Sequence, residues 1–172
     1  MRKAGALKPK MDTRNKIISV EQLAPKLREH KNRGERVVLA NGCFDVLHVG
    51  HARYLEGARR EGDVLVVAIN SDKSVRSLKG EGRPILPADA RARLVAGLAA
   101  VNYVVVFAEP DVTRLLSVLR PDVHAKGTDY TVETVPERET ARSLGVRIAI
   151  VGDPKQHSTR DLLARLRALP HD

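Results

Sequence analysis

The sequence predicts an α/β domain built on a doubly wound parallel sheet, in which helices cover both faces. Three observations carry this prediction. The continuous apolar run over residues 63–69 has the length and β-branched content of a strand buried on both faces. Segments with helical apolar spacing alternate with such runs, and the connections between them are short. A chain of 172 residues, 42% of them hydrophobic, can bury the core of one such domain.

The individual elements follow in chain order. Residues 1–15 are basic and without periodicity, which predicts a flexible tail before a domain over residues 16–172. Ser19 to Gln22 resembles a capping box, so a lead-in helix is expected within residues 16–35. Strands are expected over residues 36–40, 63–69, 103–107, 122–125 and 146–151. Helices are expected over residues 50–60 and 135–143, and a short one is expected to end at residue 78. Three more are expected to begin at Pro87, Asp111 and Ser158.

Two of these helices have a predicted buried face. The helix that Pro87 opens is expected to turn Leu94, Val95 and Leu98 toward the core, because these positions lie on one side of a helix. The helix after Asp111 has four apolar side chains at helical spacing. They are Val112, Leu115, Leu116 and Leu119.

Composition narrows the class of protein. The chain has no apolar run of about eighteen residues, and its start lacks the apolar centre of a secretory signal, so we expect a cytoplasmic protein without a membrane span. The single cysteine, Cys43, excludes an internal disulfide. The formal charge is +9, and residues 1–35 hold ten Lys or Arg against four acidic residues. Only five aromatic residues are present, without a basic base-stacking platform, which disfavours nucleic acid as the partner.

The most informative stretch is residues 42–51, which leads from an apolar strand through glycines and paired histidines into a helix. The first N–H groups of a helix lack partners, and the helix dipole makes this end attractive to phosphate. His48 and His51 lie three positions apart, so both rings can donate to phosphate oxygens from one face. The alternative is a capping side chain beside a surface residue. A zinc site with Cys43 is disfavoured because nothing completes four ligands.

Loops after the other strands carry further candidates. Lys79 and Arg83 flank glycines in a loop that could close over phosphates, or they are ordinary solvated charges. Arg91 lies in the first helical turn, where the dipole disfavours a cation, and a bound anion would explain it. Asp45 would either orient a histidine or serve as a turn residue.

The two last loops also suit a nucleotide. Lys126, Gly127, Thr128 and Asp129 directly follow a strand and could contact it, although a tight surface turn explains them too. Ser158 and Thr159 at a helix start offer hydroxyls and N–H groups, or they simply cap the helix.

Residues 42–51 resemble the His-x-Gly-His motif of the cytidylyltransferase-like nucleotidyltransferases, which binds the nucleotide triphosphate. Beyond this motif, the chain looks like the bacterial D-glycero-β-D-manno-heptose 1-phosphate adenylyltransferases over residues 16–169. The resemblance implies a Rossmann-like sheet of five parallel strands in the order 3-2-1-4-5. It also implies transfer of AMP from ATP to heptose 1-phosphate, giving ADP-heptose and pyrophosphate for lipopolysaccharide core or S-layer glycan synthesis. The matching segments are residues 68–72, 78–84, 101–105, 121–123 and 126–130.

The resemblance also implies roles for particular residues. The ATP phosphates would be bound by His48, Gly50, His51 and the backbone of Cys43 and Phe44. Lys79 and Arg91 would hold phosphate groups of substrate and nucleotide, and Mg²⁺ would arrive with ATP. The nucleotide side would be completed by Lys126, Gly127, Asp129, Ser158 and Thr159.

The resemblance also bears on domain organisation and oligomeric state, and the chain departs from the family at one position. Many members are fused to a sugar kinase, but only about 35 residues precede the first strand here, so a stand-alone transferase is expected, as a homodimer. Arg160 departs from the Ser-Thr-Thr that the family usually keeps after residue 157.

Other functions remain open at this point. The runner-up is a cytidylyltransferase that makes a CDP-alcohol such as CDP-glycerol from CTP. A non-catalytic nucleotide- or nucleic-acid-binding module is a third possibility. A class I tRNA synthetase fragment would share the histidine motif, but the chain has no Lys-Met-Ser-Lys-Ser-like segment.

Overall fold

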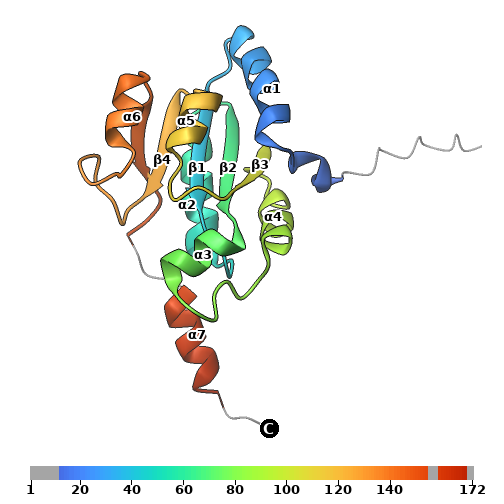
Figure 1. The fold of residues 1–172 in the computed structure, drawn as a ribbon, viewed down its shortest axis with the longest axis vertical. Coiled ribbons are helices and arrows are strands. Elements are labelled where there is room, and N and C mark those ends of the chain that lie inside the picture. Colours follow the sequence, from blue (N-terminus) through green and yellow to red (C-terminus); the bar gives the residue numbers. More distant parts are fainter. Residues whose placement is uncertain (1–11, 155–158, 170–172) are drawn as a thin grey trace, which may run out of the picture.

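The computed structural model describes residues 12–154 and 159–169 (Figure 1). The strands are β1 (Val37–Gly42), β2 (Val64–Asn70), β3 (Tyr103–Phe107), β4 (Val123–Gly127) and β5 (Arg147–Val151). The helices are α1 (Val20–Asn32), α2 (Val49–Arg60), α3 (Asp72–Lys79), α4 (Ala88–Ala96), α5 (Thr113–Leu119), α6 (Arg138–Ser143) and α7 (Thr159–Arg167), preceded by the 3₁₀ helix η1 (Thr13–Lys16). Every predicted strand and helix is present, with ends that shift by a few residues.

All neighbouring strands are parallel, and the sheet has the order β3-β2-β1-β4-β5. This confirms the predicted topology. The order reverses between β1 and β4, where Ala40 pairs with Ala125 on one side and with Val67 on the other. In open sheets of this kind, ligands bind beyond the carboxyl ends of the strands at the reversal point.

Two apolar layers sandwich the sheet. Alternate side chains of each strand point to opposite faces, so β1 sends Val38 and Ala40 to one layer and Val37 and Leu39 to the other. The first layer also contains buried side chains of α2 and α4, and the second contains those of α1, α5 and α6. In Figure 1, α5 crosses in front of β1, on the face opposite α2. The two faces of the sheet are therefore covered by different helices.

The lead-in helix begins as the sequence predicts. Ser19 accepts a hydrogen bond from the Gln22 N–H, and the Gln22 side chain accepts one from the Ser19 N–H, which completes a capping box. The last residues of the predicted tail have a regular conformation in the structure. Thr13–Lys16 form η1, and Lys16 Nζ donates to the Leu98 carbonyl at 3.2 Å. The rest of the predicted tail, residues 1–11, lies outside the described residues.

The predicted core positions are mostly confirmed. All four apolar side chains expected on the buried face of α5 are less than 5% exposed, and Val95 of α4 is fully buried. Leu94 is a correction, because it is 47% exposed. The inner face of α4 is instead formed by Arg91, Ala92, Val95 and Ala96, which leaves Leu94 on the outer side. Within the described residues, no helix has the length and apolar character needed to span a membrane.

Candidate active site

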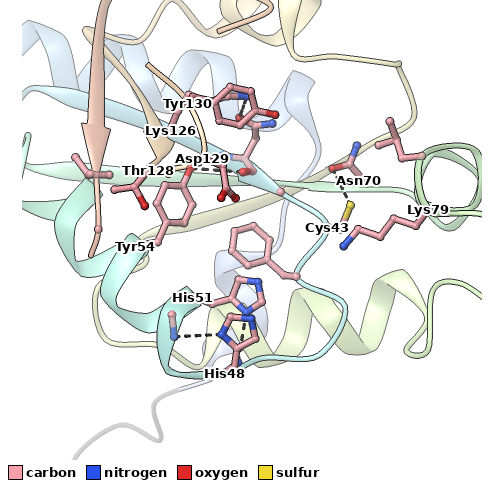
Figure 2. Close-up of a pocket in the computed structure, with 18 of the residues that line it drawn as sticks. Cys43, His48, His51, Tyr54, Asn70, Lys79, Lys126, Thr128, Asp129 and Tyr130 are labelled. Atoms are coloured by element: carbon pink, nitrogen blue, oxygen red, sulfur yellow. Dashed lines mark hydrogen bonds between the residues drawn. The ribbon is translucent and has the colours of Figure 1, made fainter. Parts of the chain in front are cut away.

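A cavity of about 1260 Å³ opens at the carboxyl edge of the sheet. Its walls come from the ends of β1, β2 and β4, from the first turn of α2, and from the loops after β3, β4 and β5. Figure 2 shows side chains from these separate elements converging on one space. Most of the predicted site residues line it: Cys43, Phe44, His48, Gly50, His51, Lys79, Lys126, Gly127 and Asp129. Ser158 and the side chain of Thr159 lie outside the described part of the chain.

The two histidines cap α2 reciprocally. The Gly50 N–H donates to His48 Nδ1 at 3.2 Å, and the His48 N–H donates to His51 Nδ1 at 3.3 Å. The rings stack with centroids 3.9 Å apart (Figure 2). Since both Nδ1 atoms accept, the proton of each neutral ring resides on Nε2. Capping, one of the alternatives for these residues, is therefore present for both rings, and it orients two Nε2–H donors.

The surroundings of His51 favour its neutral form. Burial lowers its pKa to about 4, with smaller contributions from His48 and Lys79 nearby. A neutral, partly buried ring at a helix N-terminus can donate to an anion without the cost of burying a second charge. The site thus offers donors arranged in advance for a negatively charged ligand.

The loop before the histidines has a demanding backbone. Phe44 adopts a left-handed conformation with φ +48°, and its side chain is only 2% exposed. Its ring packs against His51, with centroids 5.3 Å apart. A Cβ atom on Gly42 would lie 3.1 Å from the Phe44 ring, so the glycine makes room for this ring. Gly42 thereby supports the placement of His51.

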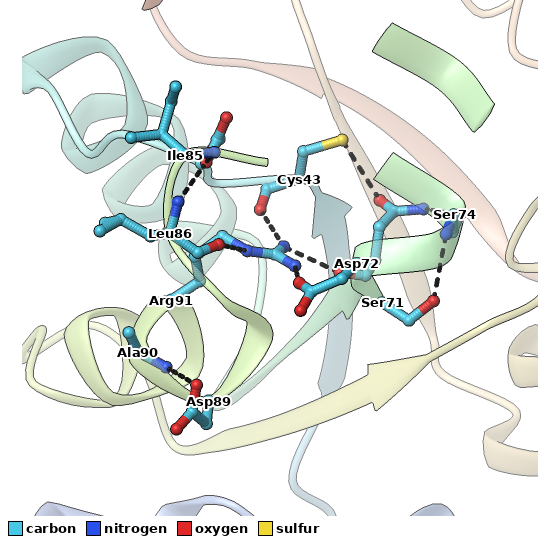
Figure 3. A network of polar contacts seen from close by, with 11 residues as sticks. Cys43, Ser71, Asp72, Ser74, Ile85, Leu86, Asp89, Ala90 and Arg91 are labelled. Carbon is cyan, nitrogen blue, oxygen red and sulfur yellow. Dashed lines mark hydrogen bonds and ion pairs between the residues drawn. The ribbon is translucent and has the colours of Figure 1, made fainter. Parts of the chain in front are cut away.

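Arg91 lies apart from the other predicted site residues. Its side chain is fully buried and does not line the cavity. The guanidinium donates to the carbonyls of Cys43 at 2.6 Å, Asn70 at 2.8 Å and Leu86 at 2.9 Å (Figure 3). It also pairs with Asp72 at 2.7 Å. The anion that explains a cation in this first helical turn is thus a carboxylate of the chain, and Arg91 positions the Cys43 loop.

Asp45 and Arg83 form a second internal pair. The Asp45 carboxylate accepts the N–H groups of Ile85 at 2.7 Å and Leu86 at 3.0 Å, and Arg83 Nη1 lies 3.1 Å from it. Asp45 therefore holds the loop after α3 in place. This differs from both predicted roles, orienting a histidine and serving as a turn residue. Lys79, at the end of α3, is exposed, and its amino group points into the cavity beside Cys43 (Figure 2).

A buried polar network at the end of β4 was only partly foreseen. Asn41 Oδ1 accepts from Lys126 Nζ at 3.3 Å and from His124 Nε2 at 3.2 Å. Lys126 Nζ also lies 3.4 Å from Glu137 and 4.7 Å from the centre of the Tyr130 ring. Asn41 could have been found as the polar residue that ends an apolar strand. Glu137 gave no such signal, because it is one of several charged residues in the helix predicted over residues 135–143, and spacing does not show which of them is buried.

Among the side chains that the structure describes, no group of three or more His, Cys, Asp or Glu residues is arranged to hold a metal ion. The predicted zinc alternative with Cys43 therefore has no ligand set in this part of the chain.

The fold, the reversal point and the histidine pair define a nucleotidyltransferase. The cytidylyltransferase-like family matches residues 39–162, and the chain belongs to this family. It is 43% identical over 154 residues to bifunctional protein HldE of Azotobacter vinelandii, covering 90% of this chain and 32% of that protein. It is 44% identical over 151 residues to bifunctional protein HldE of Pseudomonas aeruginosa PAO1, covering 88% and 32%. The chain thus spans about a third of the length of these relatives.

A solved structure supports the same assignment. The lipopolysaccharide core biosynthesis protein from Thermoplasma volcanium GSS1 superposes with a TM-score of 0.61 at 28% identity. The match covers 71% of this chain and all of that one. The similarity therefore extends over most of the described domain.

The structural role of Arg91 can be tested by substitution. Arg91→Met is expected to lower the free energy of unfolding by about 3 kcal/mol, because three backbone carbonyls and Asp72 lose their donor. Urea unfolding of purified protein measures this loss. Arg93→Met is the matched control on α4, since Arg93 is half exposed and lies 4.0 Å from Asp12, and its loss should stay below about 1 kcal/mol. Wild-type stability of Arg91→Met, with weakened ATP binding, would instead restore Arg91 as a phosphate ligand.

Stability is expected to fall on mild acidification. Burial and the charge of Lys126 lower the pKa of His124 to about 3, and the pKa of His51 is lowered to about 4. Below about pH 6.5 these two histidines bind protons in the unfolded chain but stay neutral in the folded chain. The free energy of unfolding therefore decreases as the pH falls toward their lowered pKa values. Urea titrations between pH 7 and 5 should show this decrease. His124→Gln, which keeps a donor toward Asn41, should flatten it, and an unchanged slope would contradict the assignment.

Proposed function

We propose that this chain transfers AMP from ATP to D-glycero-β-D-manno-heptose 1-phosphate, giving ADP-heptose and pyrophosphate. The observation that carries the proposal is the stacked pair of His48 and His51 at the start of α2, facing a large cavity at the reversal point of the sheet. The heptose-type motifs in residues 68–72 and 126–130, together with the identity to the HldE proteins, support the choice of acceptor.

The ATP phosphates would lie at the start of α2. The helix end supplies N–H groups and partial positive charge, and the two histidines supply Nε2–H donors. Lys79 adds a cation that points into the cavity beside Cys43. The base and ribose would extend toward the loops after β4 and β5, where Gly127, Asp129 and Gly152 line the cavity.

The reaction would need little covalent chemistry from the protein. An oxygen of the sugar 1-phosphate attacks the α-phosphorus in line, and the bond from this phosphorus to pyrophosphate breaks. Negative charge that develops on the phosphoryl oxygens and on pyrophosphate is stabilised by His48, His51, Lys79 and the helix end. Mg²⁺ enters bound to ATP, as part of the substrate. Cytoplasmic synthesis of a precursor for lipopolysaccharide, by a homodimer, belongs to the same proposal.

A substrate panel tests the proposal directly. Pyrophosphate release should be fastest with ATP and heptose 1-phosphate, and much slower when CTP replaces ATP or when another sugar 1-phosphate replaces the heptose. Continuous measurement of pyrophosphate with each pair of substrates gives kcat/KM. Turnover only with CTP and glycerol 3-phosphate would favour the cytidylyltransferase alternative. Nucleotide binding without turnover on any acceptor would favour a binding module.

Two substitutions separate the capping and donor roles of His51. Asparagine can accept the His48 N–H as Nδ1 does but cannot place a donor at the position of Nε2, so His51→Asn should fold normally and lose about 10²-fold or more in kcat. Glutamine can place a donor near Nε2, so His51→Gln should retain more activity. Steady-state kinetics and thermal unfolding of both variants measure the two effects. Near-normal kcat in His51→Asn would refute the donor role.

A further inference from the structure

The cavity has two chemically different sides. Ala40, Ile69 and Ala125 point into the apolar layer that contains α2, so the next residues of the same strands point to the opposite face. These residues are Asn41, Asn70 and Lys126. Three adjacent strands thus end in polar side chains on the face that α5 and α6 cover, whereas the histidine pair belongs to the face of α2.

Glu137 completes this second side. It lies just before α6, its side chain is only 3% exposed, and it lines the cavity. Its Oε1 accepts the Val112 N–H at 3.4 Å, at the start of α5. Its Oε2 is buried without a hydrogen bond, although Lys126 Nζ lies 3.4 Å away as an ion-pair partner. Glu137 therefore lines the cavity and has one buried carboxylate oxygen that accepts no hydrogen bond.

The chemistry of this position selects its ligand. A buried carboxylate oxygen without a donor costs free energy, which a ligand that donates hydrogen bonds would recover. The ligand group need not be a cation, because Lys126 already balances the charge of Glu137. An ionised phosphate group does not fit, because its oxygens accept hydrogen bonds and have no proton to donate to Oε2. Neutral hydroxyl groups are the donors that fit, and a sugar supplies several of them on one ring.

We propose that Glu137 is a specificity-determining residue that accepts hydrogen bonds from hydroxyl groups of the acceptor sugar. This inference rests on the proposed function, because it names where the sugar of that reaction binds. The sugar lies on the face of α5 and α6, and ATP places its phosphates on the face of α2. The sugar 1-phosphate then approaches the α-phosphorus of ATP from the other face of the sheet, across its carboxyl edge.

The test compares Glu137→Gln with wild type in pyrophosphate release. The variant should raise KM for heptose 1-phosphate about tenfold or more, while KM for ATP stays within about twofold. Wild type should also discriminate against heptose 1-phosphates that lack single hydroxyls, and the variant should lose this discrimination for at least one hydroxyl. A purely structural role of Glu137 would not produce that selective loss. Glu139→Gln is the matched control in α6, because the Glu139 side chain is 78% exposed, and it should behave as wild type.

The outcomes distinguish the inference from the proposed function. Unchanged acceptor KM in Glu137→Gln, or equal increases in KM for ATP and acceptor, would overturn the inference while wild-type turnover upholds the function. Absence of turnover by wild type with every sugar 1-phosphate would overturn both. Thermal unfolding checks that the variant is folded. Should it unfold, Glu137→Asp keeps the charge beside Lys126 but withdraws the oxygen from the cavity, and it must show the same selective rise in acceptor KM.

Discussion

The site depends on one buried guanidinium. Arg91 joins the loop after β1, the end of β2 and the start of α3 through the Cys43 carbonyl, the Asn70 carbonyl and the Asp72 carboxylate. These segments would otherwise end in unpaired buried carbonyls at the edge where the ligand must bind. Because Arg91 satisfies them from α4, the loop that leads to the histidines is held in place by the protein itself. The cation that the helix dipole disfavours is retained for this reason.

The two faces of the sheet present different chemical groups to the cavity. On the face of α2, reciprocal capping by His48 and His51 turns helix initiation into a pair of oriented donors for an anion. On the face of α5 and α6, Lys126 and Glu137 form a nearly neutral pair with an acceptor left over. A parallel sheet produces this division naturally, because consecutive residues at each strand end point to opposite sides. Donors for phosphate and an acceptor for hydroxyls can thus share one cavity without cancelling each other.

Much of the fold was predictable because its signals are local. Apolar runs, helical spacing and the capping box at Ser19 depend on neighbouring residues, and each of the corresponding elements is present. The cavity lining was largely predictable too, since the loops after parallel strands meet at one edge. Leu94 was misplaced because its outward position depends on how α4 rotates around Arg91, and spacing alone does not determine that rotation.

The sequence by itself determined the order of strands and helices, the membership of His48 and His51 in a helix start, and the family resemblance that implied the sheet order. Only the tertiary structure decided which charges are buried and what they face. Arg91 meets the Cys43 carbonyl 48 residues away, and Glu137 meets the Val112 N–H 25 residues away. Such contacts depend on packing between distant segments, so one charged residue became an internal support and another, without any local signal, became part of the cavity wall.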